Sequence, residues 1–306
     1  MTFKIRGFTE KDLPTLVKLL NKAYEKAYEF TPYTEDGLKS WIQEGKLQIL
    51  MAEKDGETVG SVAYHDGHWG EEIQWLAVSD IPQRKSVENE LVKHAEKYVK
   101  RQVVFTAVDV GSPRIDEWIE RGYKAEGGLY HMIARLDGIK SLLRVPDGII
   151  LRSLKPNEET KLVDAVNAGF GWERLKIGII ERWKSECPPF SEEWVHVAEH
   201  NQKIVSVVAS RPDTEYNEFF NGKRGYLGPA TTLQEYRGKN LASALTCRAM
   251  NFLFAQGMNS VALYTSEQNI PSIALLRKLG FTIGHHWKFM RKAFSQNKSS
   301  SDLEDE

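Results

Sequence analysis

Six consecutive residues in the C-terminal half of the sequence combine a cation, small side chains and the expected start of a helix. They are Arg237-Gly238-Lys239-Asn240-Leu241-Ala242, and they follow a strand-like segment, GYLGPATTL, almost at once. A strand that turns sharply into a helix leaves the first helical N–H groups without intrahelical acceptors, and the helix dipole makes that end attractive to anions. Gly238 and Ala242 are small enough for a diphosphate to approach the backbone. The sequence therefore predicts a site for a phosphorylated ligand.

The segment from Gly225 to Gly284 resembles the GNAT superfamily of N-acetyltransferases. The pattern Arg-x-x-Gly-x-Gly/Ala after a strand is similar to the coenzyme A pyrophosphate loop of that family, with Asn240 in place of its first glycine. Because Asn tolerates the left-handed backbone region better than other non-glycine residues, we expect a working turn. A second segment, NIPSIALLRKLGF, is similar to the family motif Asn-x-x-Ala-x-x-Leu-Tyr-x-Lys-x-Gly-Phe, which implies that Asn269 contacts the pantetheine arm or the diphosphate. The residues expected to bind acetyl-CoA are Ala230, Thr231, Thr232, Arg237, Gly238, Lys239, Asn240, Leu241, Ala242 and Asn269.

The resemblance implies direct transfer of an acetyl group from acetyl-CoA to an amine. The amine must lose a proton, the thioester oxygen needs a donor, and the departing thiolate needs an acid. Backbone groups of residues 230–232 are the candidates for the donor, and Leu276 stands where the family often has a tyrosine acid. Tyr264 is the candidate acid, or a strand aromatic that only packs. Glu267 is the candidate base, or a solvated loop carboxylate.

The chain contains two copies of one pattern. A shift of 146 positions (152 − 6) aligns FKIRGFTEKDLPTLVKLLNKAY with IILRSLKPNEETKLVDAVNAGF, and also pairs Glu53 with Glu199, which favours a structural role for both carboxylates. Farther along the shift is 158 (280 − 122), so the second copy has about a dozen extra residues. We expect an α/β fold of α+β type with a mixed sheet, in two tandem GNAT-like domains. The expected boundaries are 1–137 and 149–294 for the domains, 138–148 for a linker, and 295–306 for a disordered acidic tail.

The N-terminal copy has lost the loop chemistry. Its equivalent segment reads Arg84-Lys85-Ser86-Val87-Glu88-Asn89. A β-branched Val87 stands where the turn needs Gly or Asn, and Glu88 brings an anion to the expected helix start, where phosphates would lie. We therefore expect a degenerate domain without coenzyme A.

Composition narrows the class of partner. Forty-one basic and forty-two acidic residues leave a net charge of −1, so no global field attracts nucleic acid or an anionic membrane. Aminoacyl transfer from tRNA by a tandem GNAT-like fold is disfavoured for the same reason. No cysteine and histidine spacing indicates a metal site, and Cys187 and Cys247 are expected to be buried free thiols of a cytoplasmic protein.

The predicted function is N-acetyl transfer from acetyl-CoA to a small-molecule or peptide amine, without nucleic acid or membrane. The alternative is an acyl-CoA-binding sensor or partner subunit without turnover, suggested by Leu276 and Asn240. Trp172, Trp183 and Trp194 fall where the family has a substrate-binding loop, and they line an acceptor pocket or pack a domain interface.

Overall fold

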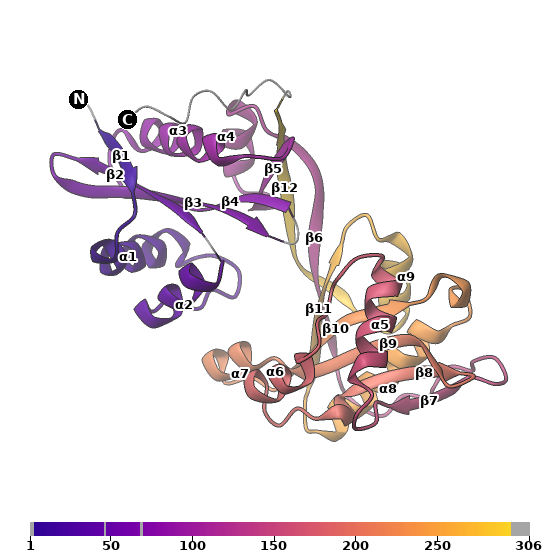
Figure 1. The fold of residues 1–306 in the computed structure, drawn as a ribbon. Helices are drawn as coiled ribbons and strands as arrows, with labels where there is room; N and C mark the ends of the chain where they lie inside the picture. Colours follow the sequence, from indigo (N-terminus) through magenta and orange to yellow (C-terminus); the bar gives the residue numbers. More distant parts are fainter. Residues whose placement is uncertain (1–2, 46, 68–69, 295–306) are drawn as a thin grey trace. The chain divides into compact units, whose positions relative to one another are not determined.

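The computed structural model describes residues 3–45, 47–67 and 70–294 (Figure 1). These residues form two compact units by their contacts. The first holds the chain up to Gly128 and again from His286, and the second is the continuous stretch Leu129–His285. The acidic tail expected at 295–306 lies outside the described residues.

The first unit is a mixed sheet with helices on both faces. Its strands run in the order β1-β2-β3-β4-β5-β12. Alternate residues of β2 face opposite sides, so Leu50 and Ala52 pack with the cluster under α3, whereas Ile49 and Met51 pack with α1 (Figure 1). The elements of the first repeat are β1 (Lys4–Gly7), α1 (Leu13–Tyr24), α2 (Glu35–Gly45), β2 (Gln48–Lys54), β3 (Glu57–Gly67), β4 (Gly70–Val78), α3 (Arg84–Ala95), β5 (Val103–Asp109), α4 (Arg114–Glu120) and β6 (Lys124–Arg135).

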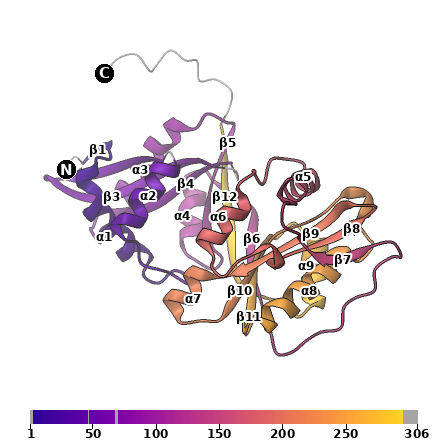
Figure 2. The same cartoon turned by 60° about the horizontal axis from the view of Figure 1, so that its bottom comes forward.

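The second unit repeats this plan with the strand order β6-β11-β10-β9-β8-β7. Helices α5 and α8 both pack on β9, from opposite faces of the sheet (Figure 2). One continuous core of buried aliphatic and aromatic side chains fills both layers. The elements of the second repeat are β7 (Ile150–Ser153), α5 (Glu159–Phe170), α6 (Ile179–Glu186), β8 (Val195–His200), β9 (Lys203–Pro212), α7 (Thr214–Phe220), β10 (Arg224–Thr232), α8 (Leu241–Ala255), β11 (Ser260–Ser266), α9 (Ile270–Lys278) and β12 (Thr282–Ala293).

Each repeat contains a hairpin that turns on two left-handed residues. Asp55 and Gly56 have φ of 53° and 86° between β2 and β3. Asn201 and Gln202 have φ of 48° and 65° between β8 and β9. Two consecutive residues with positive φ match the twist of the flanking strands, which explains why the two copies keep this turn with different residues.

The last strand of each repeat completes the other sheet. Strand β6 pairs antiparallel with β11, from Leu129 opposite Ser266 to Arg135 opposite Ser260. Strand β12 pairs antiparallel with β5, from Trp287 opposite Asp109 to Ala293 opposite Val103. The compact units therefore differ from the expected domains 1–137 and 149–294. Because of this pairing, most of β6 belongs to the second unit and most of β12 belongs to the first.

The added length of the second copy lies partly between β9 and β10. Helix α7 occupies this connection, and an ion pair between Arg224 and Asp213, with 2.7 Å between Nε and Oδ2, ties its start to β10. The guanidinium of Arg224 also lies 3.3 Å over the ring of Tyr216. No sequence signal that we used predicted this helix.

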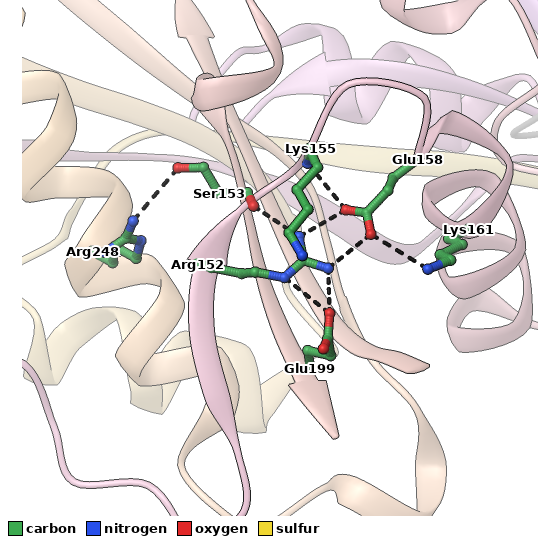
Figure 3. A network of polar contacts seen from close by, with 7 residues as sticks. All are labelled: Arg152, Ser153, Lys155, Glu158, Lys161, Glu199 and Arg248. Carbon is green, nitrogen blue, oxygen red and sulfur yellow. Dashed lines mark hydrogen bonds and ion pairs between the residues drawn. The ribbon is translucent and has the colours of Figure 1, made fainter. Parts of the chain in front are cut away.

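An arginine and two carboxylates repeat at the same place in both units. In the second unit Arg152 of β7 binds Glu158 and Glu199, and the distance from its Nη1 to Glu158 Oε2 is 2.7 Å (Figure 3). In the first unit Arg6 binds Asp12 and Glu53, each at 2.7 Å. The hydrogen bonds from Arg6 hold the pKa of Asp12 down at about 2. These contacts support the structural role expected for Glu53 and Glu199.

Candidate functional site

Strands β10 and β11 begin side by side and then separate. They pair in parallel only from Arg224 opposite Ser260 to Tyr226 opposite Ala262. On its other edge β10 stays paired with β9, with an irregularity between Leu227 and Ala230 that bends the strand. Along residues 227–232, the edge of β10 that faces β11 therefore has no strand partner among the described residues. A ligand backbone could pair there.

The loop after β10 adopts the turn expected for an anion site. Asn240 has φ 61° and ψ 8°, in the left-handed region, and Gly238 has φ 76°. Helix α8 begins at Leu241, and no side chain caps it. The first intrahelical bond runs from the N–H of Ala244 to the carbonyl of Asn240, at 2.9 Å. The N–H groups of the first turn thus have no intrahelical acceptor and lie at the positive end of the helix dipole.

Arg237 holds the loop to the elements beside it. Its Nε donates to the carbonyl of Thr232 at 3.1 Å, and its Nη2 donates to the carbonyl of Gly169, at the end of α5, at 3.1 Å. Lys239 lies 4.9 Å over the ring of Tyr236. Both cations are therefore fixed beside the open end of α8 by weak neutral contacts that leave their charge available to an anion.

Gly169 is a site residue that the sequence analysis missed. A Cβ atom here would lie 2.2 Å from Oγ1 of Thr231 and 3.1 Å from its Cβ, so α5 approaches β10 as closely as glycine allows. Ser206 Oγ donates to the carbonyl of Thr231 at 2.9 Å, which leaves that strand little freedom to withdraw. A glycine in the last turn of a predicted helix was the available signal.

We expect Gly169→Ala to destabilise the protein by about 1–3 kcal/mol, because overpacking outweighs the higher helix propensity of alanine. It should also weaken acetyl-CoA binding by displacing Thr231. Urea denaturation and calorimetric titration measure the two effects. Gly138→Ala is the control, since nothing lies within 4 Å of its added Cβ. A more stable Gly169→Ala variant would contradict the close approach.

The second motif also lies at the expected place. Asn269 caps α9, and its side-chain oxygen accepts from the N–H of Ser272 at 3.3 Å. Tyr264 projects from β11, is 46% exposed, and stacks on His131 with 4.7 Å between ring centroids. Glu267 follows the end of β11 and is half-buried. The three candidate residues all follow Ala262, where the pairing of β10 with β11 ends, and their chemical roles stay predictions.

Tyr226 is a second residue that the sequence analysis missed. It is the last residue of β10 that pairs with β11, and burial raises the pKa of its hydroxyl. Arg211 lies 4.3 Å over its ring, and its centroid is 6.0 Å from that of Tyr264. A tyrosine kept protonated beside the opening of the sheet is a further hydroxyl donor at this site.

The three tryptophans do not act together. Trp183 and Trp194 are buried in the core of the second unit, where their rings contact Phe190 and Phe252. Their apolar surface is therefore used within the core of one unit. Trp172 is 43% exposed and lies beside Phe170.

In the first unit the equivalent turn is absent. Helix α3 begins at Arg84, three residues before the expected start at Val87, and the N–H of Val87 already donates to the carbonyl of Gln83 at 3.1 Å. Strand β4 still separates from β5 after Glu72 opposite Phe105. The opening of the sheet is thus kept in this unit, whereas the loop that would hold a diphosphate has become helix.

The expected role of Glu88 as an anion at the helix start needs correction. It is 1% exposed, and its carboxylate binds three guanidinium groups, those of Arg84 at 3.0 Å, Arg121 at 2.9 Å and Arg114 at 3.4 Å. Its charge is neutralised inside the unit, so it joins α3 to α4. The three guanidinium groups are thus paired with Glu88 and are not available to a phosphate.

Neither a candidate metal cluster nor a candidate membrane-spanning helix occurs in the described residues. Within residues 3–45, 47–67 and 70–294, no cluster of three or more His, Cys, Asp or Glu side chains is placed to hold a metal ion. No helix in the same part of the chain has the length and apolar character needed to cross a membrane. Cys187 and Cys247 are buried free thiols, as predicted.

Comparison with known proteins gives matches over both repeats. The model of the acetyltransferase (GNAT) family matches residues 13–121 and 160–281. A mycothiol acetyltransferase from Frankia casuarinae is 26% identical over 159 residues, which are 47% of this chain and 46% of that protein. One from Nocardia farcinica is 23% identical over 88% of this chain and 90% of its own length. The chain spans about half the length of the first curated relatives it matches.

The fold is also found among solved structures. A GCN5-related N-acetyltransferase from Sphaerobacter thermophilus has a TM-score of 0.70 at 18% identity, covering 95% of each chain. At this identity the likeness concerns the fold alone. It extends over both repeats.

Proposed function

Because this chain belongs to the acetyltransferase (GNAT) family, and is therefore an acyltransferase, we propose that its second unit transfers an acetyl group from acetyl-CoA directly to an amine. The observation that carries the proposal is the left-handed turn at Asn240 before an uncapped helix, next to the separated strands β10 and β11. The diphosphate would bind the first N–H groups of α8, with Arg237 and Lys239 beside it. The pantetheine arm would pair with the open edge of β10.

The chemical steps assign a role to each group at this edge. A backbone N–H of residues 230–232 would stabilise the oxyanion that develops on the thioester. Glu267, acting through a water, would take the proton from the amine, and Tyr264 would return one to the thiolate. The half-buried position of Glu267 and the exposed phenol of Tyr264 support these roles. Tyr226 is the second hydroxyl within reach of the same opening.

One observation favours a second candidate function, which is acyl-CoA binding without turnover. Leu276, at the position where a tyrosine acid is common in the resembling motif, is 4% exposed and belongs to the core of the second unit. If neither Tyr264 nor Tyr226 supplies the proton, the site would retain acetyl-CoA as a sensor.

Calorimetric titration with acetyl-CoA, followed by an assay for released thiol, tests both functions. We expect one site per chain, in the second unit, and thiol release that depends on an added amine. The buried thiols of Cys187 and Cys247 should contribute little background to a thiol reagent. Stoichiometric retention without release would support the sensor, and absence of binding would end both proposals.

The acceptor is proposed to be a small-molecule or peptide amine. The amine that mycothiol acetyltransferases acetylate is the first to test, because several curated relatives carry that name. The same assay on Tyr264→Phe and Glu267→Gln separates the acid from the base. Loss of the base should lower the rate at neutral pH, with recovery as the pH rises and the free amine accumulates. Unchanged rates in both variants would remove these residues from the mechanism.

A further inference from the structure

A cavity of about 240 Å³ lies between β8, α8 and the segment that joins the two repeats. Its lining is formed by Leu142, His196, Arg248, Asn251 and Phe252. Arg248 is seven residues into α8, so it lies about 10 Å along the helix axis from the anion site at its first turn. The cavity is therefore separate from the candidate acetyl-CoA loop, and all of it belongs to the second unit.

The joining segment is bound to α8 and forms the outer wall of this cavity. Asn251 accepts from the backbone N–H of Lys140 at 2.8 Å and donates to its carbonyl at 2.7 Å. The ammonium of Lys140 donates to the carbonyl of Leu279, at the end of α9, at 3.1 Å. Residues expected to form a linker thus cross α8 as a fixed strap, which leaves Leu142, 46% exposed, at the mouth of the cavity.

His196, one of the residues that line this cavity, has a buried hydrogen-bond acceptor without a partner among the described residues. It is fully buried, and burial, together with the charge of Arg248, lowers its pKa to about 3, so the ring is neutral at physiological pH. The hydroxyl of Ser210 donates to the carbonyl of Trp194 at 2.8 Å and can only accept from His196 Nε2 at 3.3 Å. The proton therefore sits on Nε2, and the lone pair of Nδ1 has no partner among the described residues.

Arg248 presents the complementary group, an unpaired donor with a positive charge. Its buried Nε has no hydrogen-bond partner in the described part of the chain. Its Nη2 donates to the hydroxyl of Ser153 at 3.5 Å, the limit of a hydrogen bond (Figure 3). A guanidinium offers an Nε/Nη edge that matches a carboxylate with two parallel hydrogen bonds. Buried polar groups are normally satisfied, so two unpaired atoms on residues that line one cavity call for an explanation, and a bound molecule would supply one.

We propose that this cavity binds a small hydroxycarboxylate. Its carboxylate would pair with the Nε/Nη edge of Arg248, its hydroxyl would donate to Nδ1 of His196, and a short alkyl group would rest on Leu142 and Phe252. The volume equals that of about eight waters at ~30 Å³ each, which is room for five to ten non-hydrogen atoms and less than a drug-sized pocket. The two apolar walls favour a carboxylate over inorganic phosphate.

Titration of ¹⁵N-labelled protein with 2-hydroxyisovalerate tests the proposal. The resonance of His196 Nδ1 should move as its lone pair accepts a hydrogen bond, while Nε2 stays protonated. Isovalerate, which lacks the hydroxyl, should bind up to about ten-fold more weakly, and inorganic phosphate should not compete. Arg248→Leu should reduce affinity about ten- to hundred-fold, because it removes a charge-assisted pair.

Two further variants keep the test independent of folding. Leu142→Trp changes only an exposed residue at the mouth and should also weaken binding at least ten-fold by filling it. Arg277→Leu, an exposed arginine of α9, should have no effect. Absence of any change at His196 with the acid, equal affinity for isovalerate, or competition by phosphate would overturn the proposal. An unchanged acetyl-CoA titration in the same variants would show that the outcome is separate from that of the acetyltransferase site.

Discussion

Replacing Asn240 with valine is expected to abolish acetyl-CoA binding, whereas Asn240→Gly should keep or improve it. Asn240 sits at φ 61°, where a β-branched side chain collides with the backbone. Holding a non-glycine residue in this region costs about 1–3 kcal/mol, so valine should push the turn out of it. The N–H groups at the start of α8 would then point elsewhere, and the affinity should fall at least ten-fold. Calorimetric titration measures this directly.

An effect of Asn240→Val on the loop can be distinguished from an effect on the stability of the fold. Asn240 is exposed and makes no side-chain cap. The free energy of unfolding of the valine variant should therefore lie within about 1–3 kcal/mol of that of the parent protein. Gly238→Val is a matched change two residues earlier, also at positive φ, with open space around its Cβ. It should weaken binding for the same reason. If Asn240→Val binds acetyl-CoA as tightly as the parent, the left-handed turn is not what makes the site.

The sequence predicted those parts of the structure that depend on neighbouring residues. The start of α8 at Leu241 was predicted from local backbone preferences, and the turns at Asp55-Gly56 and Asn201-Gln202 follow from the same preferences. In contrast, the pairing of β6 with β11 depends on a choice between two similar sheets, and the strand sequences do not encode that choice separately. The compact units therefore change at Gly128 and His286, and the linker expected at 138–148 stays a prediction.

The residues of the candidate site that lie close together in the sequence were predictable, and those that join it from distant parts of the chain were not. The loop residues were found from their small and left-handed-tolerant side chains, whereas Gly169 and Tyr226 join the site through packing across the sheet. Glu88 shows the reverse case. Its position near a helix start suggested a charge facing a ligand, but two of the three arginines that neutralise it, Arg114 and Arg121, come from a distant part of the chain. Charge alone does not reveal which partners the fold supplies.

The repeated arginine network allows the second large prediction, on stability. Arg152→Leu should destabilise the protein by about 3 kcal/mol at pH 7, because it leaves the carboxylates of Glu158 and Glu199 together without their cation. Lys161→Met removes a peripheral, half-exposed partner of Glu158 and should cost less than about 0.5 kcal/mol (Figure 3). Urea denaturation of the three proteins measures the differences.

The pH dependence identifies the cause. Burial is the largest single influence and would raise the pKa of Glu158, but the hydrogen bonds from Arg152, from the backbone N–H of Lys155 and from Lys161, together with the charge of Arg152, outweigh it and the pKa is lowered. A lowered carboxyl pKa contributes stability above its unfolded value of 4.5, and this contribution is lost as the pH falls through the folded value. The difference in the free energy of unfolding between the parent protein and Arg152→Leu should therefore become smaller below about pH 4.5. A gap that stays constant down to pH 3 would mean that lost packing, rather than charge, destabilises the variant.

The first unit supplies a matched comparison within the same chain. Arg6 and Glu53 are 26% and 28% exposed, against 15% each for Arg152 and Glu199, so solvent screens the first network more. Arg6→Leu should therefore cost less, about 1–2 kcal/mol at pH 7. Because the pKa of Asp12 falls from 3.8 to about 2, this smaller difference should persist to lower pH than the difference for Arg152. A larger cost for Arg6→Leu would contradict exposure as the factor that sets the strength of the two networks.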